Sequence, residues 1–222
     1  MGRRFRCYHQ EQSLREVQGM KIYDWKAAPN PRRVRIFLAE KGIQVPYQQV
    51  DLPKRENLTP EFLKINPIGR VPVLELDDGT HLAETVAICR YFEELKPEPP
   101  LMGVNHRDRA LVEMWQRRME LYVLMEVALA YRNTSEFFST RIPQVPAYGA
   151  VCRNSLIEQR LPWLDRELAG RPFVAGERYT IADITLLCAI DFAERIDVRI
   201  APLQKHLARW HAAASSRPSA QA

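Results

Sequence analysis

The sequence lacks an apolar run long enough to cross a membrane, and it contains few cysteines and histidines. The richest apolar stretch, residues 122–131, has ten residues and includes Glu126, whereas a membrane-spanning helix needs about 20. The four cysteines form no Cys-x-x-Cys pair, so the sequence indicates neither a redox pair nor a zinc site. The five histidines are scattered. We therefore expect no membrane association and no metal.

Positively charged residues only slightly outnumber negatively charged ones. Thirty-two Lys and Arg face 27 Asp and Glu, a net charge of +5 over 222 residues, which suits small anionic ligands but does not indicate nucleic acid. The composition is that of an ordinary globular protein, with 46% hydrophobic and 27% charged residues. Residues 1–19 lack the apolar core of a secretory signal. We interpret them as a disordered extension, a tag or an upstream start, and we expect reduced thiols in the cytoplasm.

Residues 20–95 begin with a strand, a helix and a second strand. A short β-prone segment at 21–23 is followed by apolar residues at helical spacing, which end at Gly42. Residues 45–50 predict the second strand, and its Pro46 favours an edge position or a strand start. A helix of about ten residues between two strands favours a right-handed parallel unit.

The rest of this region predicts a hairpin and a further helix. A polar loop leads to a short helix over residues 60–64. Asp78-Gly79 lies between the β-prone segments 71–76 and 81–82, which is a strong signal for a hairpin turn. Residues 85–95 then carry apolar side chains on one helical face.

Strand signals end at residues 96–104, a linker with three prolines that exclude helix. Beyond it the pattern predicts helices only, over residues 107–131, 150–168, 181–196 and 202–214, with Pro143 and Pro146 separating the first two. The fold class expected is therefore α+β. An α/β domain at residues 20–95 precedes an all-helical domain at 105–222, and the two pack together around a cleft.

A proline lies where the strand over residues 71–76 is expected to begin. Proline cannot donate to a strand ladder, so Pro72 is awkward there. A cis Val71–Pro72 bond resolves this at a cost of about 0.5–1 kcal/mol. It also leaves the N–H and C=O of Val71 open to solvent, where they can pair with an extended peptide. The alternative is an ordinary proline at a sheet edge.

An acid and a hydroxyl residue open the helix expected at residues 85–95. The free N–H groups and the positive end of a helix N-terminus bind carboxylates. Thr85 adds a hydroxyl for that carboxylate, and Glu84 adds a counter-charge for an amino group. The pair suits the head group of an α-amino acid. The alternative is that one of the two residues only caps the helix.

Together these features resemble the thioredoxin-like domain of glutathione S-transferases. The shared motifs are Asn-Pro-x-Gly-x-Val-Pro at residues 66–72, an acid followed by Ser or Thr at Glu84-Thr85, first-helix residues at 33–36 and 40–43, and a Thr-Ile-Ala-Asp capping box at 180–183. The resemblance covers residues 20–210, nearly the whole chain. It implies an N-terminal thioredoxin-like α/β domain packed on an all-α helical bundle, and a homodimer.

The resemblance also implies a binding site for glutathione as co-substrate. The main chain of Val71, beside Pro72, is expected to pair with the cysteinyl part, while Glu84 and Thr85 hold the γ-glutamyl end. By position, Arg70 and Lys54 face the glycyl carboxylate, and the alternative for Arg70 is a plain solvated charge.

Catalysis in the family depends on a thiolate, and here the usual activating group is absent. Many classes place Tyr, Ser or Cys just before the first helix, but the matching serine position is Ala28. The zeta-class Ser-Ser-Cys signature is absent as well. Asn30 remains as the candidate catalytic residue, because its Pro-Asn setting is similar to the Thr-Pro-Asn of the bacterial nu class. The alternative is that Asn30, followed by Pro31, is the N-cap of the helix.

The function expected is transfer of the glutathione thiolate to a small hydrophobic electrophile. The first alternative is glutathione-dependent reduction of a disulfide or peroxide. The second is a non-catalytic protein of the same fold that binds glutathione or a hydrophobic ligand, an interpretation favoured by Ala28. Two further sets of residues have a plain packing interpretation: the cysteines Cys89 and Cys188, and the aromatic residues Tyr122, Tyr131, Phe137 and Phe138, whose alternative role is to line the electrophile pocket.

Overall fold

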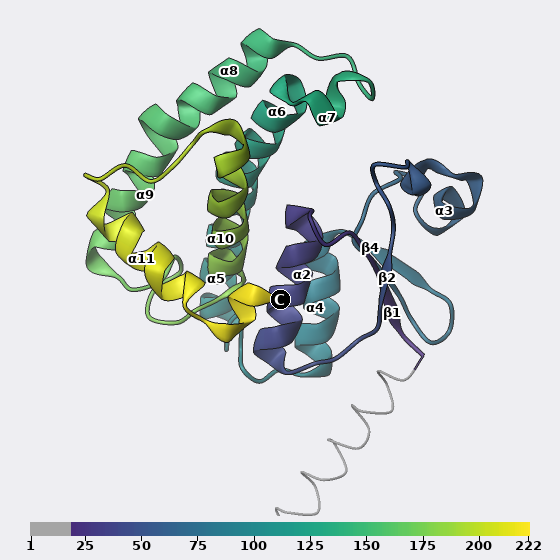
Figure 1. Ribbon diagram of the computed structural model, residues 1–222. Helices are drawn as coiled ribbons and strands as arrows, with labels where there is room; N and C mark the ends of the chain where they lie inside the picture. The colour runs from purple at the N-terminus through teal and green to yellow at the C-terminus, as the bar shows by residue number, and fades with distance from the viewer. Residues whose placement is uncertain (1–18) are drawn as a thin grey trace, which may run out of the picture. The chain divides into compact units, whose positions relative to one another are not determined.

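A computed structural model describes residues 19–222 and divides them into two compact units. The first unit extends to Pro99, and the second covers Pro100–Gln221 (Figure 1). The extension predicted at residues 1–19 lies outside the described residues except for Gly19. No helix within residues 19–222 is both long and apolar enough to cross a bilayer.

The first unit is a four-stranded sheet with helices on both faces. Its elements are β1 (Lys21–Asp24), α2 (Pro29–Lys41), β2 (Tyr47–Gln49), η1 (Glu56–Leu58), α3 (Pro60–Ile65), β3 (Val73–Glu75), β4 (His81–Ala83) and α4 (Thr85–Leu95). The strand order is β2-β1-β3-β4, with β1 parallel to β2 and the other pairs antiparallel. The predicted parallel unit, the hairpin and the edge position of the strand after Pro46 are therefore confirmed.

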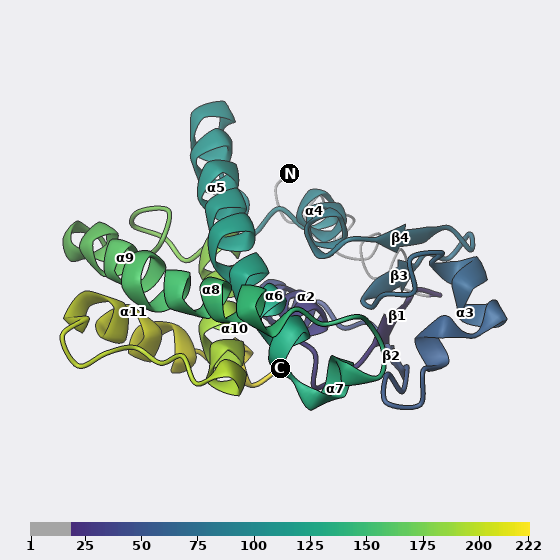
Figure 2. The same ribbon diagram turned by 90° about the horizontal axis from the view of Figure 1, so that it is seen from above.

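The two faces of the sheet carry separate apolar layers. Side chains alternate along a strand, so Ile22 and Leu74, which are register partners, face the opposite way from Tyr23 and Val73. Tyr23 and Val73 pack in one cluster with Phe62 of α3. Helices α2 and α4 cover the other face, as Figures 1 and 2 show. Both faces of the two central strands, β1 and β3, are thus largely buried.

Helix α2 ends where the sequence predicts, but it begins two residues earlier than it would if Asn30 were its N-cap. Gly42 adopts the left-handed conformation, with φ 60°, and its N–H donates to the carbonyls of the last turn. The N-cap is Ala28, and Pro29 is the first helical residue. Asn30 therefore lies inside the first turn, and the interpretation of Asn30 as the N-cap is wrong.

The regular secondary structure of the second unit is helical, apart from an isolated β-bridge between Phe173 and Gly176. Its elements are α5 (His106–Met119), the π-helical η2 (Glu120–Leu124), α6 (Met125–Thr134), α7 (Glu136–Ser139), α8 (Pro146–Ser155), the π-helical η3 (Leu156–Arg160), α9 (Leu161–Glu167), η4 (Leu168–Gly170), α10 (Ile181–Ala193), η5 (Glu194–Ile196), α11 (Lys205–Ser215) and η6 (Pro218–Gln221). The four predicted helices are present. Two of them contain π-helical turns that apolar spacing did not reveal.

One predicted boundary needs correction. Pro146 does not separate two helices, because it is the first residue of α8. Proline is tolerated there, since an N–H at that position has no partner within the helix. Helix α8 packs closely on α6 through Gly149, where an added Cβ would lie 2.8 Å from Thr134 Cγ2 and 3.3 Å from the Ala130 carbonyl oxygen.

The core of this unit is organised around α10. Thr180 and Asp183 form the predicted capping box at its start, and the Thr180 N–H donates to Asp183 Oδ2 at 2.9 Å. Asp183 Oδ1 also accepts hydrogen bonds from the Val174 N–H and the Trp210 indole, each at 2.8 Å. One buried carboxylate thus connects α10 to a preceding loop and to α11.

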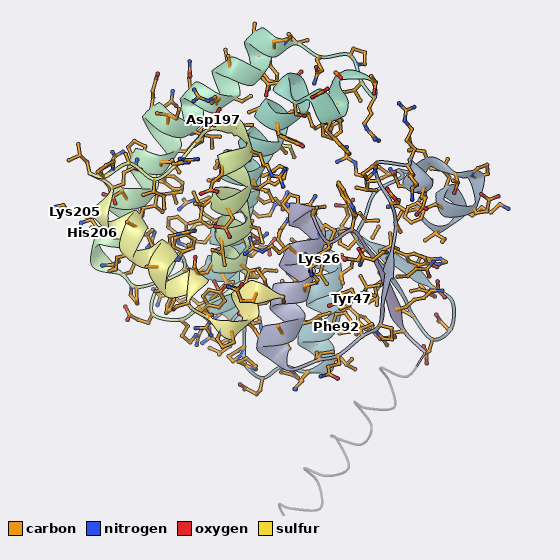
Figure 3. The ribbon with its side chains drawn as sticks, viewed as in Figure 1. Lys26, Tyr47, Phe92, Asp197, Lys205 and His206 are labelled. Carbon is orange, nitrogen blue, oxygen red and sulfur yellow. The ribbon has the colours of Figure 1, made fainter. Side chains whose placement is uncertain are left out.

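The N-terminus of α11 is capped by a neighbouring helix. Its own N-cap, Gln204, makes no side-chain cap bond. Instead, Asp165 Oδ1 accepts the N–H groups of His206 and Leu207, each at 2.8 Å. Lys205 and His206 mark this end of the helix in Figure 3. A carboxylate beside free N–H groups is a favourable cap.

Candidate functional site

The sheet topology brings three distant segments to one edge. Strand β3 runs antiparallel to β1, so the residue before Val73 lies beside the end of β1. Strand β4 runs antiparallel to β3, with Val73 opposite Ala83. The start of α2, the loop before β3 and the start of α4 therefore meet. They line a cavity of about 260 Å³ formed by Asn30, Asn66, Ile68, Arg70, Val71, Pro72, Glu84 and Thr85.

The loop before β3 is held by two asparagine side chains. Asn66 Nδ2 donates to the Arg70 carbonyl at 2.8 Å, and Asn66 Oδ1 accepts the Ile68 N–H at 3.1 Å. Asn57 Nδ2 donates to the Gly69 carbonyl at 2.7 Å. Gly69 needs the left-handed conformation, with φ 64°, and an added Cβ would lie 2.9 Å from the Asn57 carbonyl.

The fixed loop presents main-chain groups at Val71. The Val71–Pro72 bond is cis, as predicted, so the alternative of an ordinary edge proline is wrong. Strand β3 begins after it, at Val73. Among the described residues, the N–H and C=O of Val71 have no hydrogen-bond partner. Both groups are thus available to an extended ligand, as an added strand would require.

Glu84 and Thr85 lie at the start of α4, but their side chains do not cap it. Glu84 is the N-cap, yet its side chain makes no cap bond, and the first turn contains no acidic residue. Its main chain adopts φ 68° and ψ 119°, a conformation that costs a non-glycine residue about 1–3 kcal/mol. Within residues 19–222 neither the Glu84 carboxylate nor the Thr85 hydroxyl has a hydrogen-bond partner. The alternative in which these side chains only cap the helix is therefore wrong.

Asn30 lies at the start of α2 with its amide unpaired. The N–H of Ala28 is bonded to the Trp25 carbonyl, and Pro29 and Pro31 have no N–H. The main-chain N–H of Asn30 is therefore the one such group in the first turn left for a ligand. Its side-chain amide makes no hydrogen bond to any described residue. At this helix end the unpaired donors are therefore those of Asn30.

The two basic residues predicted at the site are placed differently. Arg70 is exposed and lines the cavity, and it forms no ion pair with a described residue. Lys54 is not among the lining residues. Its Nζ lies 2.9 Å from Asp51 Oδ2, and the hydrogen bond to this carboxylate raises the pKa of Lys54. Both residues remain predicted ligands.

The sequence motifs identified the loop before β3, but they did not identify three residues that fix it or line the cavity. Asn57 and Asn66 fix the main chain, and Ile68 contributes an apolar wall. Asn-Pro followed by glycine is a turn signal, so the role of Asn66 was accessible from the sequence. Asn57 is nine residues away from the loop, and nothing local marks it.

Most of the other residues that the sequence analysis considered lie in packed positions, but Tyr122 is exposed. Cys89 and Cys188 are buried, which confirms their packing role. Tyr131 packs edge to face on Phe138 and Phe192, and Tyr122 is 49% exposed. Among the described residues no group of three or more His, Cys, Asp or Glu side chains could hold a metal ion.

Comparison with known proteins assigns the fold. The N-terminal domain of glutathione S-transferases matches residues 27–95, and the C-terminal domain matches residues 154–218. "Glutathione S-transferase 2" of Saccharomyces cerevisiae is 34% identical over 98% of this chain and 94% of its own. The crystal structure of Gtt2 from Saccharomyces cerevisiae has a TM-score of 0.86 at 34% identity, covering 90% of this chain and 98% of that one.

A third relative has a different name. "Elongation factor 1-gamma" of Prunus avium is 35% identical over 61% of this chain, which corresponds to 31% of its own length. The two family domains and the near full-length similarity to the yeast transferase agree with each other. The chain therefore belongs to the glutathione S-transferase family.

Proposed function

We propose that the cavity binds glutathione and that the protein transfers the glutathione thiolate to a small hydrophobic electrophile. The observation that carries this proposal is the set of unpaired groups around one cavity: a carboxylate, a hydroxyl, an amide, a guanidinium and the two main-chain groups of one residue. These groups complement the amine, the two carboxylates and the peptide of a γ-linked tripeptide.

Each end of the tripeptide has a matching group. The γ-glutamyl carboxylate meets the Thr85 hydroxyl and the free N–H groups at the start of α4, and its amine meets Glu84. The cysteinyl main chain pairs with Val71. The glycyl carboxylate faces Arg70, with Lys54 as a more distant partner. A cavity of this size, just below the usual range for small-molecule pockets, fits a ligand that remains partly in solvent.

Thiolate formation is the chemical requirement for transfer. A free thiol has a pKa near 8.5, so only a few per cent is ionised at neutral pH. In this proposal the Asn30 amide and N–H donate hydrogen bonds to the sulfur and favour its ionised form. The rest of the rate comes from holding the thiolate next to the electrophile.

The proposal extends to the protein as a whole. Residues 20–95 bind glutathione, 96–104 are a linker, and 105–222 contribute the contacts to the electrophile. We propose a homodimer in the cytoplasm and no metal. Exposed apolar side chains on both units support the dimer: Leu58, Leu63 and Ile68 on the first, and Leu111, Met114, Leu121, Tyr122 and Met125 on the second.

The test combines calorimetry with two activity assays. Glutathione should bind, and Thr85→Val, which removes one hydroxyl at constant volume, should weaken binding by roughly tenfold. Conjugation of a chlorodinitrobenzene should proceed with the wild-type protein. Turnover of an organic hydroperoxide or a glutathione mixed disulfide instead would favour the reductase alternative. An absence of heat on titration would overturn the assignment of the cavity.

A second candidate function is non-catalytic binding. Ala28 occupies the position where many classes carry their activating hydroxyl or thiol. The similarity to "Elongation factor 1-gamma" also shows that this type of sequence occurs in a protein not named as a transferase. Glutathione binding without turnover in either assay would favour this candidate.

A further inference from the structure

Lys41 is a buried cation that holds the chain where it leaves the first unit. It is the last residue of α2, and its side chain is completely buried. Lys41 Nζ donates to the carbonyls of Lys96 at 2.8 Å, Pro97 at 3.0 Å and Pro99 at 2.6 Å. It also lies 2.5 Å from Glu93 Oε2. One ammonium group thus gathers three carbonyls of residues 96–99, which we call the exit segment.

The composition of the exit segment explains why a cation is needed there. Pro97 and Pro99 have no N–H, and the Lys96 N–H is already bonded to the Phe92 carbonyl at the end of α4. The segment therefore offers mainly acceptors, and it cannot be fixed by joining a helix or a sheet. An ammonium group has three donors and no acceptor. The donors of the Lys41 ammonium group therefore match the carbonyl acceptors of the exit segment.

Stability alone does not account for a lysine at this position. Burial lowers the pKa of Lys41, while Glu93 opposes that shift, so the charge is held at a cost. Replacing a buried ion pair by uncharged side chains of similar volume is often neutral or stabilising. An uncharged side chain, however, leaves the three carbonyls without a donor. The lysine gives the exit segment a fixed course.

We propose that Lys41 is a positioning residue for the transfer reaction, because it fixes the course of the exit segment immediately before the helical unit begins at Pro100. The inference rests on the proposed function, which assigns glutathione to the first unit and electrophile contacts to the second. Lys41 is not among the residues that line the cavity. Loosening the exit segment should therefore lower turnover and leave glutathione binding unchanged.

The test uses the full chain and removes both charges together. In Lys41→Met/Glu93→Gln no buried charge is left unpaired, so the variant should fold, with a melting temperature lowered by the loss of the donor to three carbonyls. Hydrogen exchange of the Glu98 amide in the exit segment, and of the amides of residues 101–103 directly after it, should become about tenfold faster or more, as expected when hydrogen bonds to a charged donor are lost. Conjugation should show kcat lowered by a similar factor, with the glutathione Kd within about twofold.

Two control variants separate position from charge. Glu93→Gln alone keeps the three carbonyl bonds, so exchange in the exit segment should match the wild type. Lys205→Met removes an exposed lysine at the start of α11 (Figure 3) and should change neither exchange nor kcat. If the double variant does not fold, Lys41→Gln/Glu93→Gln, which keeps an amide donor and leaves no unpaired charge, should show an intermediate exchange rate.

Wild-type exchange of the amides of Glu98 and residues 101–103 in the double variant would overturn the proposal. So would faster exchange with an unchanged kcat, because the segment would then be loose without consequence. Failure of the proposed function is recognised separately, as an absence of glutathione binding by the wild-type protein. In that case the exchange comparison still decides whether Lys41 holds the segment.

Discussion

Glu84 combines a strained main chain with a side chain that is free to bind. Its φ of 68° belongs to a region that L-residues avoid, and its carboxylate has no partner among the described residues. Such strain persists only where the surrounding structure imposes it, and it is common at ligand sites. Glu84 lies between β4 and α4, and this conformation places its carboxylate at the cavity.

Replacing Glu84 should therefore separate stability from binding. Glu84→Gly should raise the free energy of unfolding by about 1 kcal/mol relative to Glu84→Ala, because glycine adopts positive φ without strain. Both variants should bind glutathione roughly tenfold more weakly, since each lacks the charged partner of the amine. Chemical denaturation and calorimetry measure the two effects. Unaltered affinity in both variants would remove Glu84 from the site.

Asn30 offers a second test at the level of one side chain. Since Ala28 is the N-cap and the Asn30 amide is unpaired, Asn30→Ala should leave stability within about 0.5 kcal/mol of the wild type. Loss of a hydrogen bond to the thiolate should raise the pKa of bound glutathione by about one to two units. Turnover near neutral pH should fall by a similar order, roughly 10- to 100-fold.

The absorbance of the thiolate, followed against pH in the bound state, measures this shift. Asn30→Asp provides the matched control, because a carboxylate of the same shape repels the thiolate and should raise its pKa further. A pKa that is the same in wild type and both variants would leave the thiol without a protein group to activate it. The non-catalytic candidate would then be favoured.

At the scale of elements, the sequence predicted most of the fold because periodicity and turn residues act locally. Gly42 ends α2, and Asp78-Gly79 marks the hairpin, as expected. The start of a helix after two closely spaced prolines is harder to predict, because proline is tolerated at the first helical position and excluded further in. For that reason both the start of α2 and the role of Pro146 were misjudged.

The sequence predicted which residues form the candidate site better than it predicted how their side chains are paired. Strand directions bring Val71 and Glu84 to one edge, and the motifs identified both residues. Whether the Asn30 side chain caps the helix or remains free depends on a shift of two residues in the helix start. The pairing of Lys54 with Asp51 depends on the fold of a loop that has no periodic pattern.

Asp183 joins three elements through one buried carboxylate, and it makes a prediction about pH. Burial raises the pKa of Asp183 from 3.8 to about 6, although hydrogen bonds from Val174, Trp210 and Thr180 act in the opposite direction. Because the folded-state pKa is the higher one, the folded protein binds more protons in this range. The contribution of this group to stability is full below about pH 4 and is lost as pH rises through about 6.

The comparison with Asp183→Asn isolates that contribution. The variant should be less stable than the wild type, because its amide nitrogen faces donors that the carboxylate accepts. Its deficit should be larger at about pH 4.5 than at pH 7, by about 2 kcal/mol, because this interval covers only part of the shift in pKa. Denaturation curves at both pH values give the difference. A deficit independent of pH would mean that the carboxyl titrates with its ordinary pKa.

At the scale of the whole molecule, apolar residues left at the surface bear on assembly. Leu111, Met114, Leu121, Tyr122 and Met125, which we call the exposed strip, follow one another along α5, η2 and α6 at helical spacing, and each is between 37% and 49% exposed. Single exposed apolar residues are common, whereas larger exposed apolar patches often mark interaction surfaces. The proposed homodimer gives the exposed strip a partner.

A charge placed in the exposed strip should therefore dissociate the proposed homodimer. Met125→Glu should weaken self-association roughly hundredfold or more, because an unpaired carboxylate is costly to bury in an interface. Leu203→Glu is the matched control, since Leu203 is 87% exposed and lies outside the strip. Sedimentation equilibrium gives the mass of each species. A wild-type protein that sediments as a monomer, or a dimer that persists in Met125→Glu, would show that the exposed strip is not the dimer interface.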